Sequence, residues 1–175
     1  MTDMRMRPDP ATGYPGRTYR FYTGETVYTF GDGLSYSKYN HELVEAPKLV
    51  SIPLDEGHSC YNTTCESVSL ADSRCQNQNA VVFNVRLNVH NSGSMAGGHT
   101  VLLFFTPPTV HGAPQTHLLG FEKVFLEGNG KGEVVFKVDA CRDLSVTDEV
   151  GDRKVALGAH TLHVGNLKHS LSIGI

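Results

Sequence analysis

VVFNVRLNVH, at residues 81–90, is the stretch that decides the fold class. Its apolar side chains, at Val81, Phe83, Val85, Leu87 and Val89, alternate with mostly polar neighbours. Successive side chains on an extended strand point to opposite faces, so the alternation predicts one apolar face and one polar face. At the helical period, the same apolar side chains would be scattered around the cylinder. The stretch therefore predicts a half-buried β-strand.

Seven further stretches have the character of short strands, and residues typical of turns separate them, as at Pro107-Pro108 and Gly165-Asn166. Residues 101–105, VLLFF, are apolar on both faces, which predicts a strand that is central or covered on both sides. This succession predicts an all-β chain with a two-sheet, immunoglobulin-like β-sandwich. The predicted strands are 48–54, 81–90, 100–106, 118–126, 133–138, 154–157, 161–164 and 170–175.

The composition limits the class of protein. A chain of 175 residues has room for one full domain and an appendage. Its 15 basic and 18 acidic residues are interspersed and give a net charge of −3, so no surface for nucleic acid or an anionic membrane is expected. No apolar run approaches the roughly 18 to 20 residues of a membrane-spanning helix. Neither nucleic acid nor a membrane is therefore a predicted partner.

Residues 1–40 differ from the rest of the chain because six of the seven tyrosines lie within the first 39 residues. Aromatic residues favour extended structure, so two short strands are predicted at 18–22 and 26–30. Two strands alone are marginal in water, and this segment therefore needs a further surface to pack against. The favoured interpretation is contact with a neighbouring domain, and the alternative is stacking of the tyrosines on sugar rings. The candidate contact residues are Tyr14, Tyr19, Tyr22 and Tyr28, with Phe21 among them.

Four cysteines, three of them within the polar loop 55–80, indicate an oxidising setting. The sequon at Asn62, which reads Asn-Thr-Thr, is a candidate glycosylation site and favours secretion. Four cysteines can pair in three ways, and the favoured pairs are Cys60–Cys65 and Cys75–Cys141. The first 16 residues contain no apolar core of a signal peptide. We therefore expect the chain to be the C-terminal piece of a longer secreted protein.

No catalytic, cofactor or metal site is predicted. His160 and His163 are three residues apart on a predicted strand, so their side chains point to opposite faces. Asp148-Glu149 are adjacent and Asp32 lies between two glycines, so turns explain these carboxylates better than an opposed acid and base do. No serine stands in a Gly-x-Ser-x-Gly elbow. The remaining histidines that were considered as metal ligands are scattered, at His58, His90, His99, His111, His117 and His169.

Three stretches resemble one enzyme family. Residues 12–39, TGYPGRTYRFYTGETVYTFGDGLSYSKY, resemble the end of the second catalytic-region domain in glycoside hydrolase family 3, whose usual FGxGLSY reads FGDGLSY here. HLLGFEKVFL at 117–126 and the stretch 143–173 are similar to the fibronectin type III-like domain at the C-terminus of that family. Within this family, the three stretches most resemble the sequences of the plant β-D-xylosidases and α-L-arabinofuranosidases. Asp32 stands where relatives often have an aromatic residue or histidine.

The resemblance implies a division of the chain and a role. Residues 1–40 would be a remnant of the preceding glycosidase domain and the linker, and 41–175 the fibronectin type III-like sandwich with the cysteine-containing loop 55–80. Because the family's catalytic aspartate and acid/base lie upstream of this region, no catalytic residue is assigned here. The implied function is a non-catalytic accessory domain of a cell-wall enzyme that acts on xylan and arabinan. Its partners would be the upstream catalytic domains, and the alternative is a carbohydrate-binding module for xylan or arabinoxylan.

Overall fold

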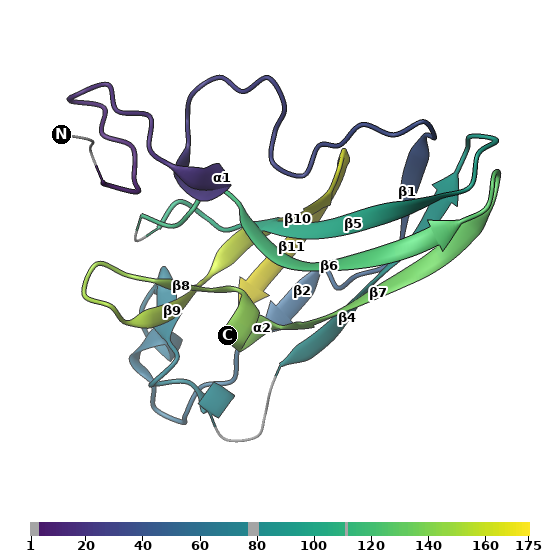
Figure 1. Cartoon of the computed structure of the whole chain (residues 1–175). Coiled ribbons are helices and arrows are strands. Elements are labelled where there is room, and N and C mark those ends of the chain that lie inside the picture. The colour runs from purple at the N-terminus through teal and green to yellow at the C-terminus, as the bar shows by residue number, and fades with distance from the viewer. Residues whose placement is uncertain (1–3, 77–80, 111) are drawn as a thin grey trace.

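The computed structural model describes residues 4–76, 81–110 and 112–175, and within them the chain is nearly all β (Figure 1). The strands are β1 (Tyr39–Glu45), β2 (Leu49–Ser51), β3 (Ser67–Ser69), β4 (Val82–Asn91), β5 (Gly97–Thr106), β6 (His117–Leu126), β7 (Lys131–Asp139), β8 (Ser145–Thr147), β9 (Arg153–Ala156), β10 (Gly158–Val164) and β11 (Leu167–Gly174). The short helices are α1 (Thr18–Phe21), η1 (Ser59–Tyr61), η2 (Arg74–Gln76) and α2 (Ala140–Asp143). The predicted all-β class is confirmed.

Two larger sheets form the sandwich, and a small third sheet lies at their side. The first sheet has the strand order β1-β4-β7, the second β2-β11-β10-β5-β6, and the third β3-β9-β8. Their pairs are antiparallel except β2 with β11, which run parallel. The register of the first sheet sets Leu87 of β4 between Leu43 of β1 and Val134 of β7. This register aligns apolar side chains of three strands on the face that meets the second sheet.

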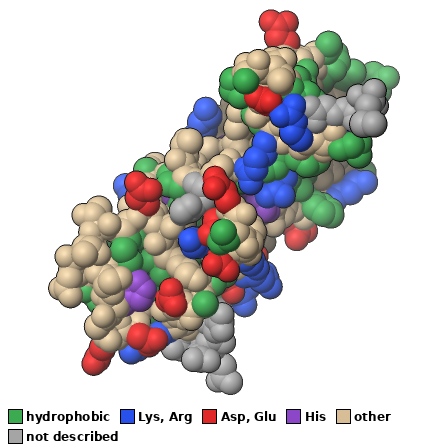
Figure 2. Space-filling model, turned by 90° about the vertical axis from the view of Figure 1, so that its left-hand side faces the viewer, with side chains coloured by type: hydrophobic (Ala, Val, Ile, Leu, Met, Phe, Trp, Pro, Cys, Tyr) green, Lys and Arg blue, Asp and Glu red, His purple; other side chains and the backbone are tan. Residues whose placement is uncertain are grey.

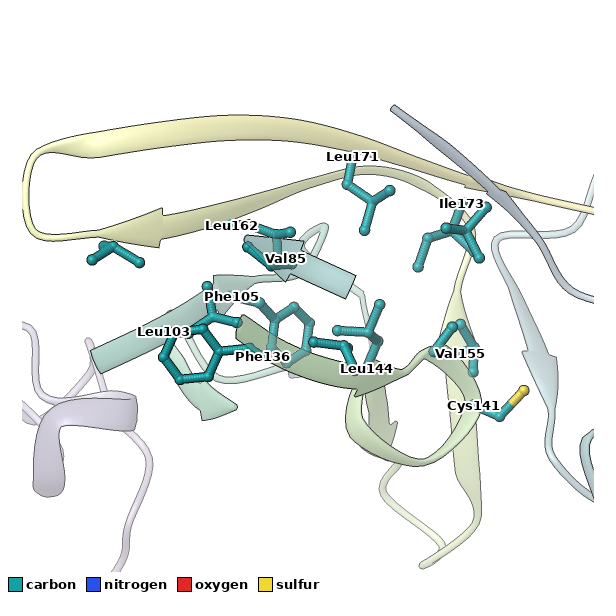
Figure 3. Close-up of a cluster of buried hydrophobic side chains, with 14 of the residues drawn as sticks. Val85, Leu103, Phe105, Phe136, Cys141, Leu144, Val155, Leu162, Leu171 and Ile173 are labelled. Atoms are coloured by element: carbon teal, nitrogen blue, oxygen red, sulfur yellow. The ribbon is translucent and has the colours of Figure 1, made fainter. Parts of the chain in front are cut away.

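The hydrophobic core lies between the two larger sheets (Figure 3). From β4, Val85, Leu87 and Val89 are at most 2% exposed, which is the inward face that the alternation predicts. From the second sheet, Leu103, Phe105, Leu162 and Leu171 meet them. Burying one such side chain contributes roughly 1.5 to 3 kcal/mol to folding. The predicted two-sheet packing is therefore the main source of stability.

β5 occupies the central position that its two apolar faces predict, between β10 and β6. Leu103 and Phe105 face the core, whereas the neighbouring Phe104 faces outward and is still only 6% exposed. Its cover is the segment that precedes the sandwich, which passes above β10 and β5 in Figure 1. Around Phe104, both faces of β5 are thus covered, whereas Gly98 and Thr100 of the same strand are exposed.

The predicted strands at 18–22 and 26–30 are wrong. Residues 18–21 form the single turn of α1, and residues 22–38 contain no regular strand or helix. The prediction relied on the β-propensity of aromatic residues, which reflects packing on a sheet surface rather than a backbone preference. Here the rings of Tyr19 and Phe30 pack on Phe104 of β5, while the backbone of residues 18–30 pairs with no strand of the sandwich.

The sequence also missed three strands: β1, β3 and β8. Only Leu43 and Val44 mark β1 as apolar, and β3 and β8 have three residues each, too few for an alternation to be visible. The stretch 55–80, predicted as a loop, contains η1, β3 and η2 within its described residues. No helix in the described parts of the chain is long and apolar enough to cross a membrane.

Candidate functional site

The segment that precedes the sandwich packs on β5 through a cluster of three aromatic rings. Tyr19 and Phe30 stack with their centroids 4.2 Å apart and their planes within 15°. Phe104 meets both rings edge-on, at 6.1 Å from Tyr19 and 6.0 Å from Phe30. Edge-to-face and offset contacts of this kind add about 0.5 to 1.5 kcal/mol beyond area burial. The cluster therefore fixes residues 19–30 on the outer face of the second sheet.

Hydrogen bonds anchor the same segment to the start of β6. The backbone N–H of Leu118 donates to the hydroxyl of Tyr19 at 3.3 Å. The backbone N–H of Gln115 donates to the carbonyl of Arg20 at 2.9 Å. These contacts hold α1 beside the sandwich, so part of the N-terminal segment has its packing surface within this chain.

Two hollows lie between the segment and the sheet. The larger, of about 510 Å³, is lined by aromatic rings, threonine hydroxyls and an amide, and its described lining includes neither Asp nor Glu. Its size is within the range of small-molecule sites. The smaller, of about 300 Å³, contains one carboxylate, Asp32. An acid and a base on opposite sides of a sugar-sized space, which glycoside hydrolysis needs, are absent from both linings as described. The larger hollow is lined by Tyr19, Tyr22, Thr23, Gly24, Thr26, Thr29, Phe30, Phe104, Gln115, Thr116 and His163.

Asp32 has the turn role expected of it. Its carboxylate accepts hydrogen bonds from the Thr29 hydroxyl at 2.6 Å and the Thr29 backbone N–H at 3.0 Å. These two bonds lower the pKa of Asp32. The carboxylate is thereby kept ionised and occupied with its own loop, which is unsuited to a proton donor.

The four candidate tyrosines do not act as one group. Tyr19 and Tyr22 line the larger hollow, whereas Tyr14 and Tyr28 do not. The Tyr14 hydroxyl accepts from Nε of Arg17 at 2.8 Å and donates to the carbonyl of Arg5 at 2.8 Å. Tyr28 is 64% exposed. Because Tyr14 and Tyr19 are engaged within the chain, the structure does not support a flat platform for sugar rings.

The apolar segment 27–36 leaves large side chains in solvent. Val27 is 93%, Leu34 89% and Tyr36 96% exposed, and Tyr28 and Phe30 are more than half exposed. Single exposed apolar residues are ordinary, but five within ten residues of an irregular segment are not. The sequence predicted a segment in need of another surface, and this part of it remains uncovered.

A histidine pair joins the two larger sheets. Nε2 of His41 on β1 lies 2.9 Å from Nε2 of His99 on β5, and the ring centroids are 5.1 Å apart. Tyr39 stacks on His99 at 4.2 Å. Such a bond needs a proton on one nitrogen and a lone pair on the other. Burial lowers the pKa of both imidazoles, and the charge of His41 lowers that of His99 further. The sequence missed this pair because 58 residues separate its members.

We expect the His41–His99 pair to make the protein less stable as the pH falls from 7 to 5. An unfolded imidazole has a pKa of about 6.5, and the folded values are lower, so the unfolded chain binds more protons in this range. This contribution is complete above that value and is lost as the pH falls through the folded pKa values. The free energy of unfolding, measured with urea at both pH values, should change less between pH 7 and pH 5 in H41Q/H99Q than in the unsubstituted chain.

The control for this prediction is N88Q, on the outer face of β4, which removes no titratable group. It should leave the change in stability between pH 7 and pH 5 as it is in the unsubstituted chain. Burial also lowers the pKa of His117, His160 and His163, so part of the dependence of stability on pH will persist in the double variant. If the free energy of unfolding changes equally between pH 7 and pH 5 in H41Q/H99Q and in the unsubstituted chain, the His41–His99 pair does not cause the pH dependence.

The structure also places other histidines that were considered as metal ligands, and the cysteines that were expected to form disulfides. His160 is buried with Nε2 2.9 Å from the carbonyl of Ala156, and His163 stacks on Phe104, so the two rings do lie on opposite faces of β10. His111 lies outside the described residues. Among described residues, no three His, Cys, Asp or Glu side chains form a group that could hold a metal ion. The disulfides are Cys60–Cys65 and Cys75–Cys141, and Asn62 is exposed.

Comparison with known proteins agrees with this fold. A family model described as a fibronectin type III-like domain matches residues 99–168. Beta-xylosidase/alpha-L-arabinofuranosidase 1 of Medicago sativa subsp. varia is 62% identical over 175 residues, covering 100% of this chain and 22% of the relative. Beta-D-xylosidase 3 of Arabidopsis thaliana is 54% identical, covering 100% of this chain and 23% of the relative. A solved GH3 exo-beta-xylosidase matches 99% of this chain and 22% of its own, with a TM-score of 0.72 and 24% identity.

The sandwich is therefore a fibronectin type III-like domain. The chain as a whole belongs with the C-terminal part of the plant β-xylosidases and α-L-arabinofuranosidases of glycoside hydrolase family 3, as the sequence resemblance implies. It spans about a fifth of the length of the curated relatives it matches.

Proposed function

We propose that this chain is a non-catalytic accessory region of a family 3 glycosidase of the β-xylosidase/α-L-arabinofuranosidase type, and that it stabilises the catalytic part by packing against it. The observation that carries the proposal is the apolar segment 27–36. Its exposed side chains are those of a contact surface, and the described hollows lack the carboxylate pair of a glycosidase site. The role is thus mechanical: burial of these side chains would stabilise the assembled enzyme.

The proposed compartment is the oxidising exterior of the plant cell, in the cell wall. Two disulfides among the described residues suit that setting. Asn62 follows η1 in an exposed loop closed by the Cys60–Cys65 disulfide, where an oligosaccharide would project into solvent. Glycosylation of Asn62 remains a prediction. Residues 1–40 are proposed as the end of the preceding domain.

The test exchanges the matching part of the Medicago relative for this chain, which gives a full-length chimera. The chimera should hydrolyse nitrophenyl xyloside or nitrophenyl arabinofuranoside, whereas the isolated chain should release no nitrophenol above a heat-killed control. In the chimera, L34S/Y36S should lower the free energy of unfolding by about 3 kcal/mol, because two buried apolar side chains are lost. In the isolated chain the same substitutions should have little effect, since both side chains are already exposed.

V150S is the matched control, because Val150 is 82% exposed on the turn between β8 and β9. It should change neither protein by more than about 0.5 kcal/mol. Equal effects of L34S/Y36S in the chimera and in the isolated chain would contradict the proposed packing. Hydrolysis by the isolated chain would contradict the non-catalytic role.

A further inference from the structure

Arg20, in α1, carries a positive charge that no described residue neutralises. Its Nε is buried and has no hydrogen-bond partner. Its Nη2 lies 3.3 Å from Nδ1 of His117, a ring whose pKa is lowered by burial and by the charge of Arg20 itself. A neutral imidazole nitrogen can accept this bond but supplies no negative charge. The guanidinium is therefore desolvated in part and forms no ion pair with an Asp or Glu side chain of the described residues.

Arg7 places a second positive charge beside the first. Its guanidinium lies 4.9 Å from the centroid of the Phe21 ring, and that of Arg20 lies 5.6 Å from the same centroid. Arg7 also donates to the backbone carbonyl of Gly112. A cation over an aromatic ring gains only about 0.5 to 2 kcal/mol. The shared ring thus offsets little of the repulsion between the half-buried Arg20 and the exposed Arg7.

Other arginines of the chain show what is missing here. Arg74, Arg86 and Arg142 each have a carboxylate oxygen within 3.2 Å. Within the described residues, Arg7 and Arg20 form no ion pair with Asp or Glu. Arg74, Arg86 and Arg142 thus each have a carboxylate partner, whereas Arg7 and Arg20 have none among the described residues.

The charge balance of the segment is one-sided as well. Residues 1–21 contain four arginines and two acidic residues, Asp3 and Asp9, of which Asp9 pairs with Arg5. Figure 2 shows Lys and Arg side chains gathered beside hydrophobic ones over the N-terminal segment, in the upper part of the view. A partner that covers this face must bring negative charge, because burying unpaired guanidinium groups costs several kcal/mol.

We infer that Arg20 and Arg7 form a docking site for a carboxylate, an Asp or Glu side chain on the catalytic part of the same glycosidase. The inference rests on the proposed function and adds the chemistry of the contact to it. A guanidinium can donate two parallel hydrogen bonds to a carboxylate, and because Nε of Arg20 is buried, a partner would be bound by the N–H groups of Nη1 and Nη2. Arg7, whose guanidinium lies near the same Phe21 ring, strengthens the attraction through its charge. The apolar segment 27–36 supplies burial in the same interface, and the arginines supply orientation.

The experiment compares R20Q in the chimera and in the isolated chain. Glutamine keeps a donor for His117 and removes the charge. In the chimera, R20Q should shorten the half-life of thermal inactivation by about tenfold, because a charge-assisted pair is lost and a carboxylate is left unpaired. In the isolated chain it should leave the unfolding midpoint unchanged or raise it, since a buried unpaired cation is removed. R7Q should act in the same direction in both proteins, by a smaller factor.

R74Q is the matched control, because it breaks an exposed ion pair with Asp55 and should change both proteins equally and little. If R20Q lowers the stability of the chimera and of the isolated chain by the same amount, Arg20 is only a structural residue and the inference is overturned. If L34S/Y36S destabilises the chimera while R20Q does not, the proposed function stands and the carboxylate site is overturned. If neither changes the chimera, both are overturned.

Discussion

Replacing both Cys75 and Cys141 with serine is expected to lower the free energy of unfolding by about 4 kcal/mol. The disulfide joins residues 66 apart in sequence, from η2 to α2 at the end of β7. Closing a loop of this length removes much conformational entropy from the unfolded chain, and the cost of losing that constraint grows with loop length. Urea unfolding of C75S/C141S against the unsubstituted chain measures the difference.

The other disulfide is the internal control. Cys60 and Cys65 are separated by 5 residues, so the same entropy argument gives about 2 kcal/mol for C60S/C65S. Equal losses in the two double variants would show that loop entropy is not the main term. Peptide mapping under non-reducing conditions checks the connectivity before either variant is interpreted.

The strands that could be predicted from the sequence are those in which apolar and polar residues alternate over many positions. β4 has ten residues, and its inward positions are consistently apolar from Val85 to Val89. β1 was missed because His41 interrupts its inward face with a polar ring. That ring is satisfied by His99, on another sheet and 58 residues away, and no local pattern reveals such a partner.

In the N-terminal segment, the sequence predicted strands that the structure does not have. The propensity of Tyr19, Phe21 and Tyr22 for extended structure was real as a tendency to pack on a sheet surface, and Tyr19 does so on Phe104. A strand also needs a neighbouring backbone, which composition does not supply. The need of this segment for a second surface could be predicted from its aromatic content. The lack of an ion pair at Arg20 could not be predicted, because it depends on how far the fold places each carboxylate from this arginine.

Asn91 is the second position where a single change should have a large effect. It ends β4, is 0% exposed, and its amide nitrogen donates to the carbonyls of Met95 at 2.8 Å and Glu127 at 3.1 Å. Its amide oxygen accepts from the backbone N–H of Gly93 at 3.0 Å. One side chain thus ties the loop between β4 and β5 to the turn between β6 and β7.

We expect N91A to lower the free energy of unfolding by about 3 kcal/mol, because it removes three hydrogen bonds worth about 1 kcal/mol each and leaves buried backbone groups without partners. N84A, at an exposed position of the same strand, should cost less than about 0.5 kcal/mol. Both are measured by urea unfolding at pH 7. Comparable losses in N84A and N91A would mean that strand propensity, rather than the buried amide, sets the cost.

N91D separates shape from hydrogen-bond chemistry, since aspartate matches asparagine in size but offers only acceptors when ionised. Its carboxylate would face the carbonyl oxygens of Met95 and Glu127, so at pH 7 the loss should exceed that of N91A. Burial beside these acceptors would raise the pKa of the introduced carboxyl group above its unfolded value. The folded protein would then bind the extra proton more readily than the unfolded chain, and the penalty should shrink as the pH falls toward 4. A loss that is independent of pH would show that the pKa of the introduced carboxyl group is not raised by folding, which would contradict its burial beside these acceptors.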